Sequence, residues 1–266
     1  MRLIRQWLGA PVAYHTLYRD FVVQDLGGRY AGSMGGLAWT VLVPLAQLAV
    51  YVFVFSTIMR VDVDRSAVGT DRFVIYLLTG MIPWLAFAES LTRAPSLLVE
   101  RASLITKVAF PVEILPLVGS SVPFLLNGVG FGILLVYLAF YGYADVVWLS
   151  LPLVVVMQFL FTVGVVAIVS ALGVFVRDIQ QFIGIVVFTW FFLTPIVYPL
   201  SMVPEAFRGW LRLNPMFPFI DLYRSILLRN AVAPGSCVAT SLLAVTVFLA
   251  GGWLFLRFKP AFADVL

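Results

Sequence analysis

The sequence predicts an all-α integral membrane protein with six transmembrane helices. Of its 266 residues, 62% are hydrophobic and only 11% are charged, whereas soluble domains are about half apolar and a quarter charged. The apolar runs reach the roughly 20 residues that a helix needs to cross a bilayer. They do not alternate as barrel strands do, so a helix bundle is expected.

Residues 1–33 are expected to form a cytoplasmic unit of their own, an amphipathic helix that lies in the membrane interface. The i, i+3, i+4, i+7 spacing of an amphipathic face is occupied by Tyr14, Leu17, Tyr18 and Phe21. Gly27 and Gly28 are expected to end the helix. An ordinary surface helix packed on the bundle is the alternative.

Residues 34–266 are expected to form the transmembrane domain. Its six spans are predicted at 34–59, 73–92, 111–141, 147–175, 179–199 and 237–256. The third span is overlong and contains three prolines, so we expect it to start at the interface and to bend. No internal repeat is visible, which counts against the inverted-repeat secondary transporters.

The distribution of Lys and Arg favours a cytoplasmic N-terminus and C-terminus. In that orientation the inner segments hold ten basic residues and the outer segments seven, and four of the seven lie within 200–235. Five prolines also interrupt 194–228. Either the topology is inverted, or 200–235 is not an ordinary loop.

Glu89 is the acidic residue best placed to act within a span, since carboxylates at mid-bilayer are costly and usually functional. It lies close to the end of the second span and four residues before Arg93. The expected role is therefore an i, i+4 ion pair with Arg93 at the cytoplasmic end.

The loop after the second span, 91–116, is expected to form a short amphipathic helix in the cytoplasm. An apolar stripe is expected from Leu97, Leu98, Leu104 and Ile105, among charged residues. The stripe suits a protein partner and the lipid surface equally well. The turn at 176–181 is expected to be a hairpin, in which Arg177 and Asp178 could cap the helix ends.

Aromatic residues make up 15% of the chain. Most are expected in the core or in an interfacial belt. Their flat apolar faces and polar edges also suit sugar rings, and the candidates for sugar contact in a channel are Tyr51, Phe55, Trp190, Phe192 and Tyr198. Composition alone leaves the belt and the sugar surface both open.

Several kinds of site are not expected. The only lysines are Lys107 and Lys259, and no glycine-rich phosphate loop precedes either, so ATP hydrolysis by that route is excluded. The single histidine, His15, has no catalytic motif around it. With one cysteine, Cys237, no internal disulfide and no metal site are predicted. A membrane-embedded glycosyltransferase would need a convergent Asp/His/Glu set, which is missing.

Seven segments, in order, resemble one family: the membrane subunits of ABC exporters for polysaccharides and other polyprenyl-linked glycans. They are RYAGSMGGLAWTVLVPLAQLAVYVFVF (29–55), YLLTGMIPWLAF (76–87), SLLVERASLITKVAFPVEILP (96–116), VRDIQQF (176–182), TPIVYP (194–199), LNPMFPFIDLYRSILL (213–228) and FKPAFADVL (258–266). The family includes permeases for O-antigen, capsule and teichoic acid, and the last segment is most similar to the O-antigen branch.

The resemblance implies a homodimer that binds two separate ATP-binding-cassette subunits. ATP and Mg²⁺ would then bind to those partners, and this chain would hold no cofactor. Residues 95–107 would form the coupling helix, with ATPase contacts from Arg93, Leu97, Glu100, Arg101, Leu104 and Lys107. The N-terminal helix would touch the ATPase as well. Residues 200–235 would form two short re-entrant helices on the periplasmic side, broken at Pro199–Pro204 and Asn214–Pro218, with their arginines facing the exit of a wet channel.

The implied function is export of a polyprenyl-diphosphate-linked polysaccharide, O-antigen first, across the bacterial inner membrane through a continuous channel. Arg5 and Arg29 are expected to attract the diphosphate of the carrier, although anchoring of the cytoplasmic side explains them equally well. The other partners implied are membrane lipids, with no nucleic acid. An ABC exporter of capsule, teichoic acid, a small lipid or a drug is the alternative.

Overall fold

The computed structural model describes residues 2–29, 35–58, 65–107 and 110–266. Within these ranges the regular structure is helical, with no strand. The helices are α1 (Arg2–Ala13), α2 (His15–Arg29), α3 (Trp39–Val52), α4 (Arg65–Val68), α5 (Phe73–Arg93), α6 (Ala102–Lys107), α7 (Ile114–Phe140), α8 (Leu151–Phe175), α9 (Ile179–Leu193), α10 (Glu205–Arg212), α11 (Phe217–Leu228) and α12 (Pro234–Val265). The predicted boundary at 33/34 lies outside the described residues.

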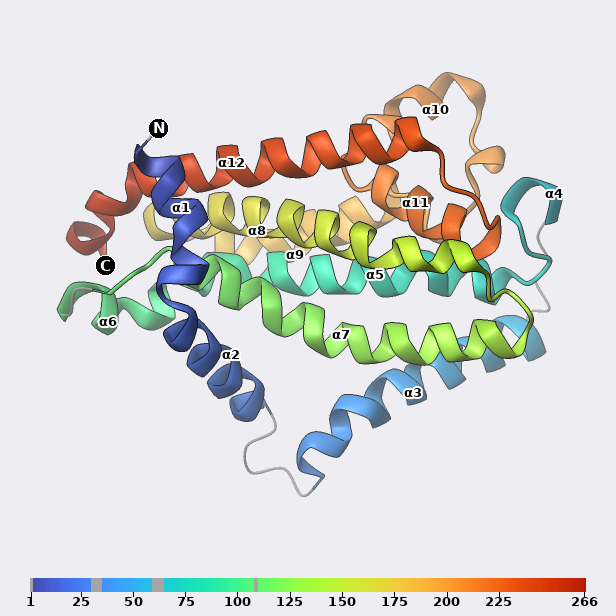
Figure 1. Cartoon of the computed structure of the whole chain (residues 1–266), viewed down its shortest axis with the longest axis horizontal. Helices are drawn as coiled ribbons and strands as arrows, with labels where there is room; N and C mark the ends of the chain where they lie inside the picture. The colour runs from blue at the N-terminus through green and yellow to red at the C-terminus, as the bar shows by residue number, and fades with distance from the viewer. Residues whose placement is uncertain (1, 30–34, 59–64, 108–109) are drawn as a thin grey trace.

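Four segments are long and apolar enough to cross a membrane, and they run side by side in Figure 1. They are Phe73–Ser96, Ile114–Phe140, Val146–Phe175 and Pro234–Val265. They correspond to the second, third, fourth and sixth predicted spans. The last helix continues well beyond the predicted end at 256, and the third begins at Ile114 rather than at 111.

The predicted first and fifth spans are shorter apolar helices, Trp39–Phe55 and Ile179–Leu193. With 15 residues, α9 rises about 22 Å at 1.5 Å per residue, which is less than the hydrocarbon core of about 30 Å. The six-span count is therefore not confirmed. The predicted limits of the first span, 34 and 59, lie outside the described residues.

Helices α8 and α12 form the most extensive contact in the bundle, and glycines allow it. A Cβ added to Gly251 would lie 2.2 Å from the carbonyl oxygen of Gly164, and one added to Gly164 would lie 2.4 Å from that of Val247. Real Cβ atoms do not approach other atoms this closely, so only glycine fits at these two positions. As in other membrane bundles, small residues let the two backbones approach closely.

The third predicted span is bent, as its prolines led us to expect. In Figure 1 the first turns of α7 slope away from the rest of the helix. Pro123 lies inside α7, where it lacks the N–H that would continue the helical hydrogen-bond ladder. The bend directs the start of α7 toward α2. There Val118 and Val122 of α7 pack against Val22 of α2.

The N-terminal region contains two helices, α1 and α2, where we expected one. Gly27 and Gly28 do not end a helix, since α2 continues to Arg29. Trp7 is 2% exposed and packs against Phe248 and Phe255 of α12. Buried side chains thus attach the two helices to the bundle, and their location in the membrane interface stays a prediction.

The hairpin at 176–181 is present, with α8 ending at Phe175 and α9 beginning at Ile179. Asp178 occupies the N-cap position but its side chain makes no capping hydrogen bond. Its carbonyl oxygen accepts a hydrogen bond of 3.1 Å from the backbone N–H of Phe182 instead. Side-chain capping by Asp178 is therefore wrong, although the turn itself is right.

The segment 200–235 contains two short helices, α10 and α11, separated at Asn214 as the prolines indicated. They differ in burial: α11 buries most of its side chains against α5 and α8, whereas α10 buries none. In Figure 1 they lie at the right-hand end of the bundle with α4, and α1, α6 and the C-terminus lie at the left-hand end. We call these two ends of the bundle the α6 end and the α10 end.

Candidate functional site

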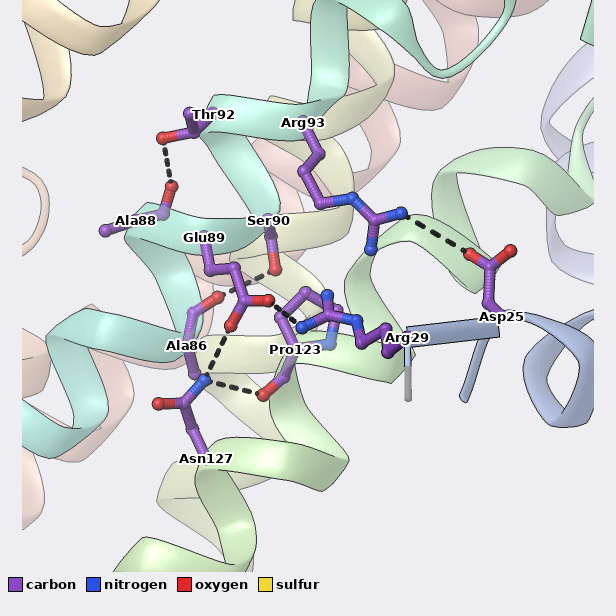
Figure 2. A network of polar contacts seen from close by, with 10 residues as sticks. All are labelled: Asp25, Arg29, Ala86, Ala88, Glu89, Ser90, Thr92, Arg93, Pro123 and Asn127. Atoms are coloured by element: carbon purple, nitrogen blue, oxygen red, sulfur yellow. Dashed lines mark hydrogen bonds and ion pairs between the residues drawn. The ribbon is translucent and has the colours of Figure 1, made fainter. Parts of the chain in front are cut away.

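Glu89 lies at the centre of a polar network where α2, α5 and α7 meet (Figure 2). Its carboxylate forms an ion pair with Arg29 of α2 and accepts a hydrogen bond of 3.0 Å from Nδ2 of Asn127 of α7. The same amide donates to the carbonyl oxygen of Pro123 at 2.9 Å. One carboxylate thus connects three helices at the α6 end.

The predicted ion pair between Glu89 and Arg93 is wrong. Arg93 is directed toward Asp25 of α2, with Nη2 and Oδ2 3.9 Å apart, and Figure 2 shows the two pairs pointing in different directions. Helix α2 supplies a closer partner to each residue. The i, i+4 rule considers only one helix, so it could not anticipate a second helix packed alongside.

Asp25 also joins the segment after α5 to α2, a role that sequence reasoning missed. Its Oδ1 accepts a hydrogen bond of 2.7 Å from Nη2 of Arg101. Both side chains are about 85% buried, since their exposed fractions are 15% and 14%. The guanidinium of Arg101 also lies 5.5 Å from the ring centre of Phe21, within the range of a cation–π contact.

Asp25 and Arg29 are four residues apart on α2 and therefore share one face. That face is bonded to Arg101 at one position and to Glu89 at the other. As a result α2 bridges the segment 94–107 to α5 and α7 through ion pairs. We call Arg101, Asp25, Arg29 and Glu89 the α2 bridge.

The segment 94–107 is a chain of short turns where one helix was expected. Two 3₁₀ turns, Ala94–Ser96 and Val99–Arg101, precede the six residues of α6. Ser96 donates a hydrogen bond of 2.6 Å to Glu100. The exposed charged side chains of the segment are Glu100 and Lys107.

The apolar stripe predicted for this segment does not face outward. Leu97 and Leu98 are 3% and 0% exposed and belong to the core, while Leu104 and Ile105 are half-buried. Glycines explain the difference, because a Cβ on Gly173 would lie 2.4 Å from the carbonyl oxygen of Pro95. The segment therefore sits against α8 more closely than its composition suggested, and an ATPase contact through it stays a prediction.

The two arginines predicted to attract a lipid diphosphate have different surroundings. Arg5 is exposed on α1, and no ion pair to it is present among the described residues. Arg29 is 22% exposed and holds Glu89, yet its buried Nη2 has no hydrogen-bond partner within the described part of the chain. The structure therefore does not join the two in one site.

A second buried cluster fastens α1 and α12 to the start of α7. Glu113 is 2% exposed and accepts hydrogen bonds from Nζ of Lys259 at 2.7 Å and from Nε2 of Gln6 at 3.0 Å. A carboxylate buried to this extent is stable only when it is paired. The cluster is best explained as a structural contact that holds α1 and α12 to the start of α7.

Arg224 of α11 is the main polar group at the α10 end. It is 7% exposed, and it donates hydrogen bonds to the carbonyl oxygens of Pro195 at 2.6 Å and Ile196 at 3.0 Å. It also donates to the hydroxyl oxygen of Tyr76 at 2.7 Å, with its guanidinium 3.6 Å from the centre of that ring. The sequence predicted that this arginine faces the exit of a wet channel, whereas its side chain is buried and bonded to protein groups.

The burial of Arg224 has a physical cause in the broken end of α9. Pro195 and the following turns leave backbone carbonyls without helical partners, and such groups are costly when they are buried. A guanidinium carries five N–H donors and can satisfy several carbonyls at once. Gly80 makes room for it, because a Cβ there would lie 2.7 Å from Nη2 of Arg224. No sequence pattern around Arg224 indicates that it binds these carbonyls.

Three of the predicted sugar-contact residues lie along the end of α9 and the turn after it. Trp190 donates a hydrogen bond of 2.7 Å to Asn214 and packs edge-on to Phe87, so it joins α9 to the α10–α11 connection. Phe192 is 47% exposed. The hydroxyl of Tyr198 donates a hydrogen bond of 2.6 Å to the carbonyl oxygen of Phe192.

The other two, Tyr51 and Phe55, lie on and just after α3. Their rings stack at 6.4 Å, and Phe55 contacts Phe73 of α5 at 5.2 Å. Phe73 in turn lies 6.4 Å from Tyr76, so the aromatic row reaches the residue that Arg224 binds. Contact with sugar stays a prediction for all five residues. No group of three or more potential metal ligands is present in the described residues.

Comparison with known proteins gives a consistent result over most of the chain. Residues 22–228 match the family model for the ABC-2 type transporter. The chain is 30% identical over 250 residues to "O-antigen export system permease protein RfbA" of Klebsiella pneumoniae, covering 91% of this chain and 92% of that protein. It is 32% identical over 256 residues to the protein of the same name from Myxococcus xanthus, at 94% and 92% coverage. "Polysialic acid transport protein KpsM" of Escherichia coli is 23% identical over 222 residues, at 80% and 81% coverage.

Proposed function

Because the chain belongs to the ABC-2 type transporter family, we propose that it is the membrane subunit of an ATP-driven polysaccharide exporter. Its cargo is a polyprenyl-diphosphate-linked polysaccharide, with O-antigen as the first candidate, and its location is the bacterial inner membrane. The observation that carries the proposal is the match over nine-tenths of the chain to two proteins named as O-antigen export permeases.

A long polymer imposes a continuous path through the membrane, since it cannot be enclosed at one site and released at the other side. We place this path between two copies of the chain. Helices α3 and α9 support the placement: α3 buries no side chain, and α9 buries only Ile183 and Val187. Their remaining apolar surface is free for a second copy, and the aromatic candidates Tyr51, Phe55, Phe192 and Tyr198 lie on or next to these helices.

The energy for export comes from two ATP-binding-cassette subunits that bind at the α6 end, with ATP and Mg²⁺ bound there. Both chain termini lie in the cytoplasm in this arrangement. The contact is made by the segment 94–107, in which Glu100 and Lys107 are exposed and Leu104 is half-buried. Leu97 is buried and supports the contact from beneath. Arg93 and Arg101 act through Asp25 of α2.

The α2 bridge carries movement of this segment into the bundle. A displacement of Arg101 moves α2 through its ion pair with Asp25. Arg29, on the same face of α2, then moves Glu89 of α5. Glu89 in turn is bonded to Asn127 of α7. Ion pairs that are mostly buried are screened little by salt. They therefore keep more of their strength at physiological ionic strength than exposed pairs would.

The carrier diphosphate enters at the same end in this proposal, next to α2. Within the described residues the buried Nη2 of Arg29 has no hydrogen-bond partner, so a phosphate oxygen that reached it would find a donor, and arginine suits phosphate because its N–H groups match two oxygens at once. Arg5 on α1 adds positive charge at the membrane surface. An arriving diphosphate would then compete with Glu89 for Arg29.

The proposal is tested by purifying the chain with and without the ATP-binding-cassette subunit proposed as its partner. We expect no ATP hydrolysis from the chain alone, and hydrolysis with co-purification when both subunits are present. Hydrolysis by the isolated chain would overturn the proposal. Membrane vesicles that take up a small lipid or a drug, but not the lipid-linked polymer, would support the alternative cargo.

A further inference from the structure

A small pocket of about 190 Å³ opens at the α10 end, between the start of α5, the turn after α9 and α11. Its apolar wall contains Val68, Phe217 and Ile220, and its polar rim contains Asp221 and Arg229. Tyr76 lies behind the wall, with its ring covered by the guanidinium of Arg224. We propose that this pocket binds one pyranose ring of the exported polymer as the polymer leaves the protein. The inference rests on the proposed function and adds a substrate site to it.

The chemistry of the lining matches a sugar ring. A pyranose presents a face of C–H groups, which packs on aromatic and aliphatic side chains, and a rim of hydroxyls, each of which both donates and accepts hydrogen bonds. Asp221 supplies acceptors and Arg229 supplies donors. Their charged groups lie side by side, with Nη2 of Arg229 2.7 Å from Oδ1 of Asp221, so two neighbouring hydroxyls could engage both.

The exposure of this ion pair makes it available to a ligand. The side chains of Arg229 and Asp221 are 42% and 45% exposed, and an exposed pair contributes little stability in water. Sugar hydroxyls can therefore insert between the two groups, or bind to their free edges, at little energetic cost. The pair is a binding element here rather than a fastening of the fold.

Size limits what the pocket can hold. Sites for drug-sized ligands measure about 300–1,000 Å³, and this pocket is smaller, so it accommodates one ring and not a whole repeat unit. A contact with one ring at a time allows a polymer to advance in steps. Arg224 also lines the pocket, but its Nη atoms are occupied by Tyr76 and the carbonyls of Pro195 and Ile196. It is a positioning residue that holds the wall.

The test uses photo-crosslinking in cells that make the polymer and both transporter subunits. A benzoylphenylalanine is placed at Ser201 on the pocket rim or at Phe217 in its wall, and glycan attached to the chain is detected after irradiation. Phe207 on α10 is the control, because it is 61% exposed yet does not line the pocket. Phe192 reports separately on the proposed channel.

We expect glycan on the chain from Ser201 and Phe217 and none from Phe207. Crosslinks from Phe192 without any from Ser201 or Phe217 would overturn the pocket and leave the exporter proposal standing. Absence of glycan at all four positions, in a chain that still co-purifies with its ATPase, would overturn both. Equal crosslinking from Phe207 would show unspecific contact and would also contradict the pocket.

Two substitutions remove the recognition groups without touching the core. Asp221→Asn and Arg229→Gln each delete one charged partner, and we expect roughly tenfold less crosslinking from Ser201, the usual effect of losing one hydrogen bond to a charged group. Glu205→Gln is the matched control, since Glu205 forms a similar exposed pair with Arg208 on α10. Co-purification with the ATPase should be unchanged in all three. Unchanged crosslinking in both pocket variants would overturn the proposal.

Discussion

At the scale of single residues, two arginines make buried contacts that stabilise the molecule. Each supplies hydrogen bonds to polar groups on a distant segment that would otherwise lack a partner. Arg224 satisfies carbonyls that the proline-broken end of α9 leaves without partners. Arg101 satisfies Asp25 on a helix more than 70 residues earlier in the sequence. Both roles depend on contacts between distant segments, which a residue's sequence neighbours do not reveal.

Replacing Arg224 tests the first role. Arg224→Met keeps most of the volume but leaves the carbonyls of Pro195 and Ile196 buried without donors, at a cost of about 1–3 kcal/mol for each unsatisfied group. We expect a clearly lower melting temperature of the purified protein in detergent. Arg212→Met, at an exposed position on α10, is the control. Equal melting temperatures for the two variants would show that Arg224 does not hold the broken helix end.

A glycine pair tests the same contact by steric means. Gly80→Ala places a Cβ 2.7 Å from Nη2 of Arg224, whereas Gly128→Ala on α7 places its Cβ with nothing within 4 Å. Since alanine favours a helix over glycine by about 1 kcal/mol, we expect Gly128→Ala to raise the melting temperature slightly and Gly80→Ala to lower it. The packing argument fails if Gly80→Ala is as stable as Gly128→Ala.

At the scale of elements, α2 and the α10–α11 pair make contacts with helices that are distant from them in the sequence. Helix α2 bonds to the segment 94–107 and to α5 and α7 through the α2 bridge. Helix α11 is packed inside the bundle, whereas α10 remains exposed and amphipathic, with Phe207, Trp210 and Leu213 all above 60% exposure. Exposed aromatic residues of this kind are typical of helices at a membrane interface.

A charge exchange tests the α2 bridge. Arg101→Asp and Asp25→Arg should each lower the rate of export coupled to ATP hydrolysis, because each places two like charges together in a mostly buried pair. The double exchange should recover much of the loss, as a double-mutant cycle requires of interacting residues. Glu100→Lys, on an exposed residue of the same segment, should instead weaken co-purification with the ATPase. No recovery in the double exchange would remove the bridge from the mechanism.

Cysteine labelling tests the placement of α10 and α11. In a Cys237→Ser background, single cysteines at the exposed positions Ser201 and Ala233 should both react with a membrane-impermeant thiol reagent added from the periplasmic side. Met216→Cys, at a position with 0% exposure, should react slowly. If position 233 is labelled only in broken membranes, positions 201 and 233 lie on opposite sides of the membrane. That result would contradict a re-entrant pair of helices.

At the scale of the whole molecule, composition and periodicity were enough to predict a helical membrane bundle and its four long helices. The two short helices between Pro199 and Pro234 were expected from the family resemblance, and the proline-containing segments Pro199–Pro204 and Asn214–Pro218 agree with where the structure breaks them. Sequence could not predict that Leu97 and Leu98 are buried, because the glycines that admit this segment lie on other helices: Gly119 meets Leu97, and Gly173 meets Pro95. For the same reason it paired Glu89 with Arg93 and missed Asp25.

The central claim is that this chain carries a lipid-linked polysaccharide across the inner membrane. The most direct measurement is to delete its gene in the bacterium that encodes it and to locate the polymer. We predict that the polymer disappears from the cell surface and accumulates in the cytoplasm on its polyprenyl carrier, and that the intact gene restores export. Normal polymer at the surface, or its absence from both compartments, would contradict the account, since the first excludes a role in export and the second indicates a role in synthesis.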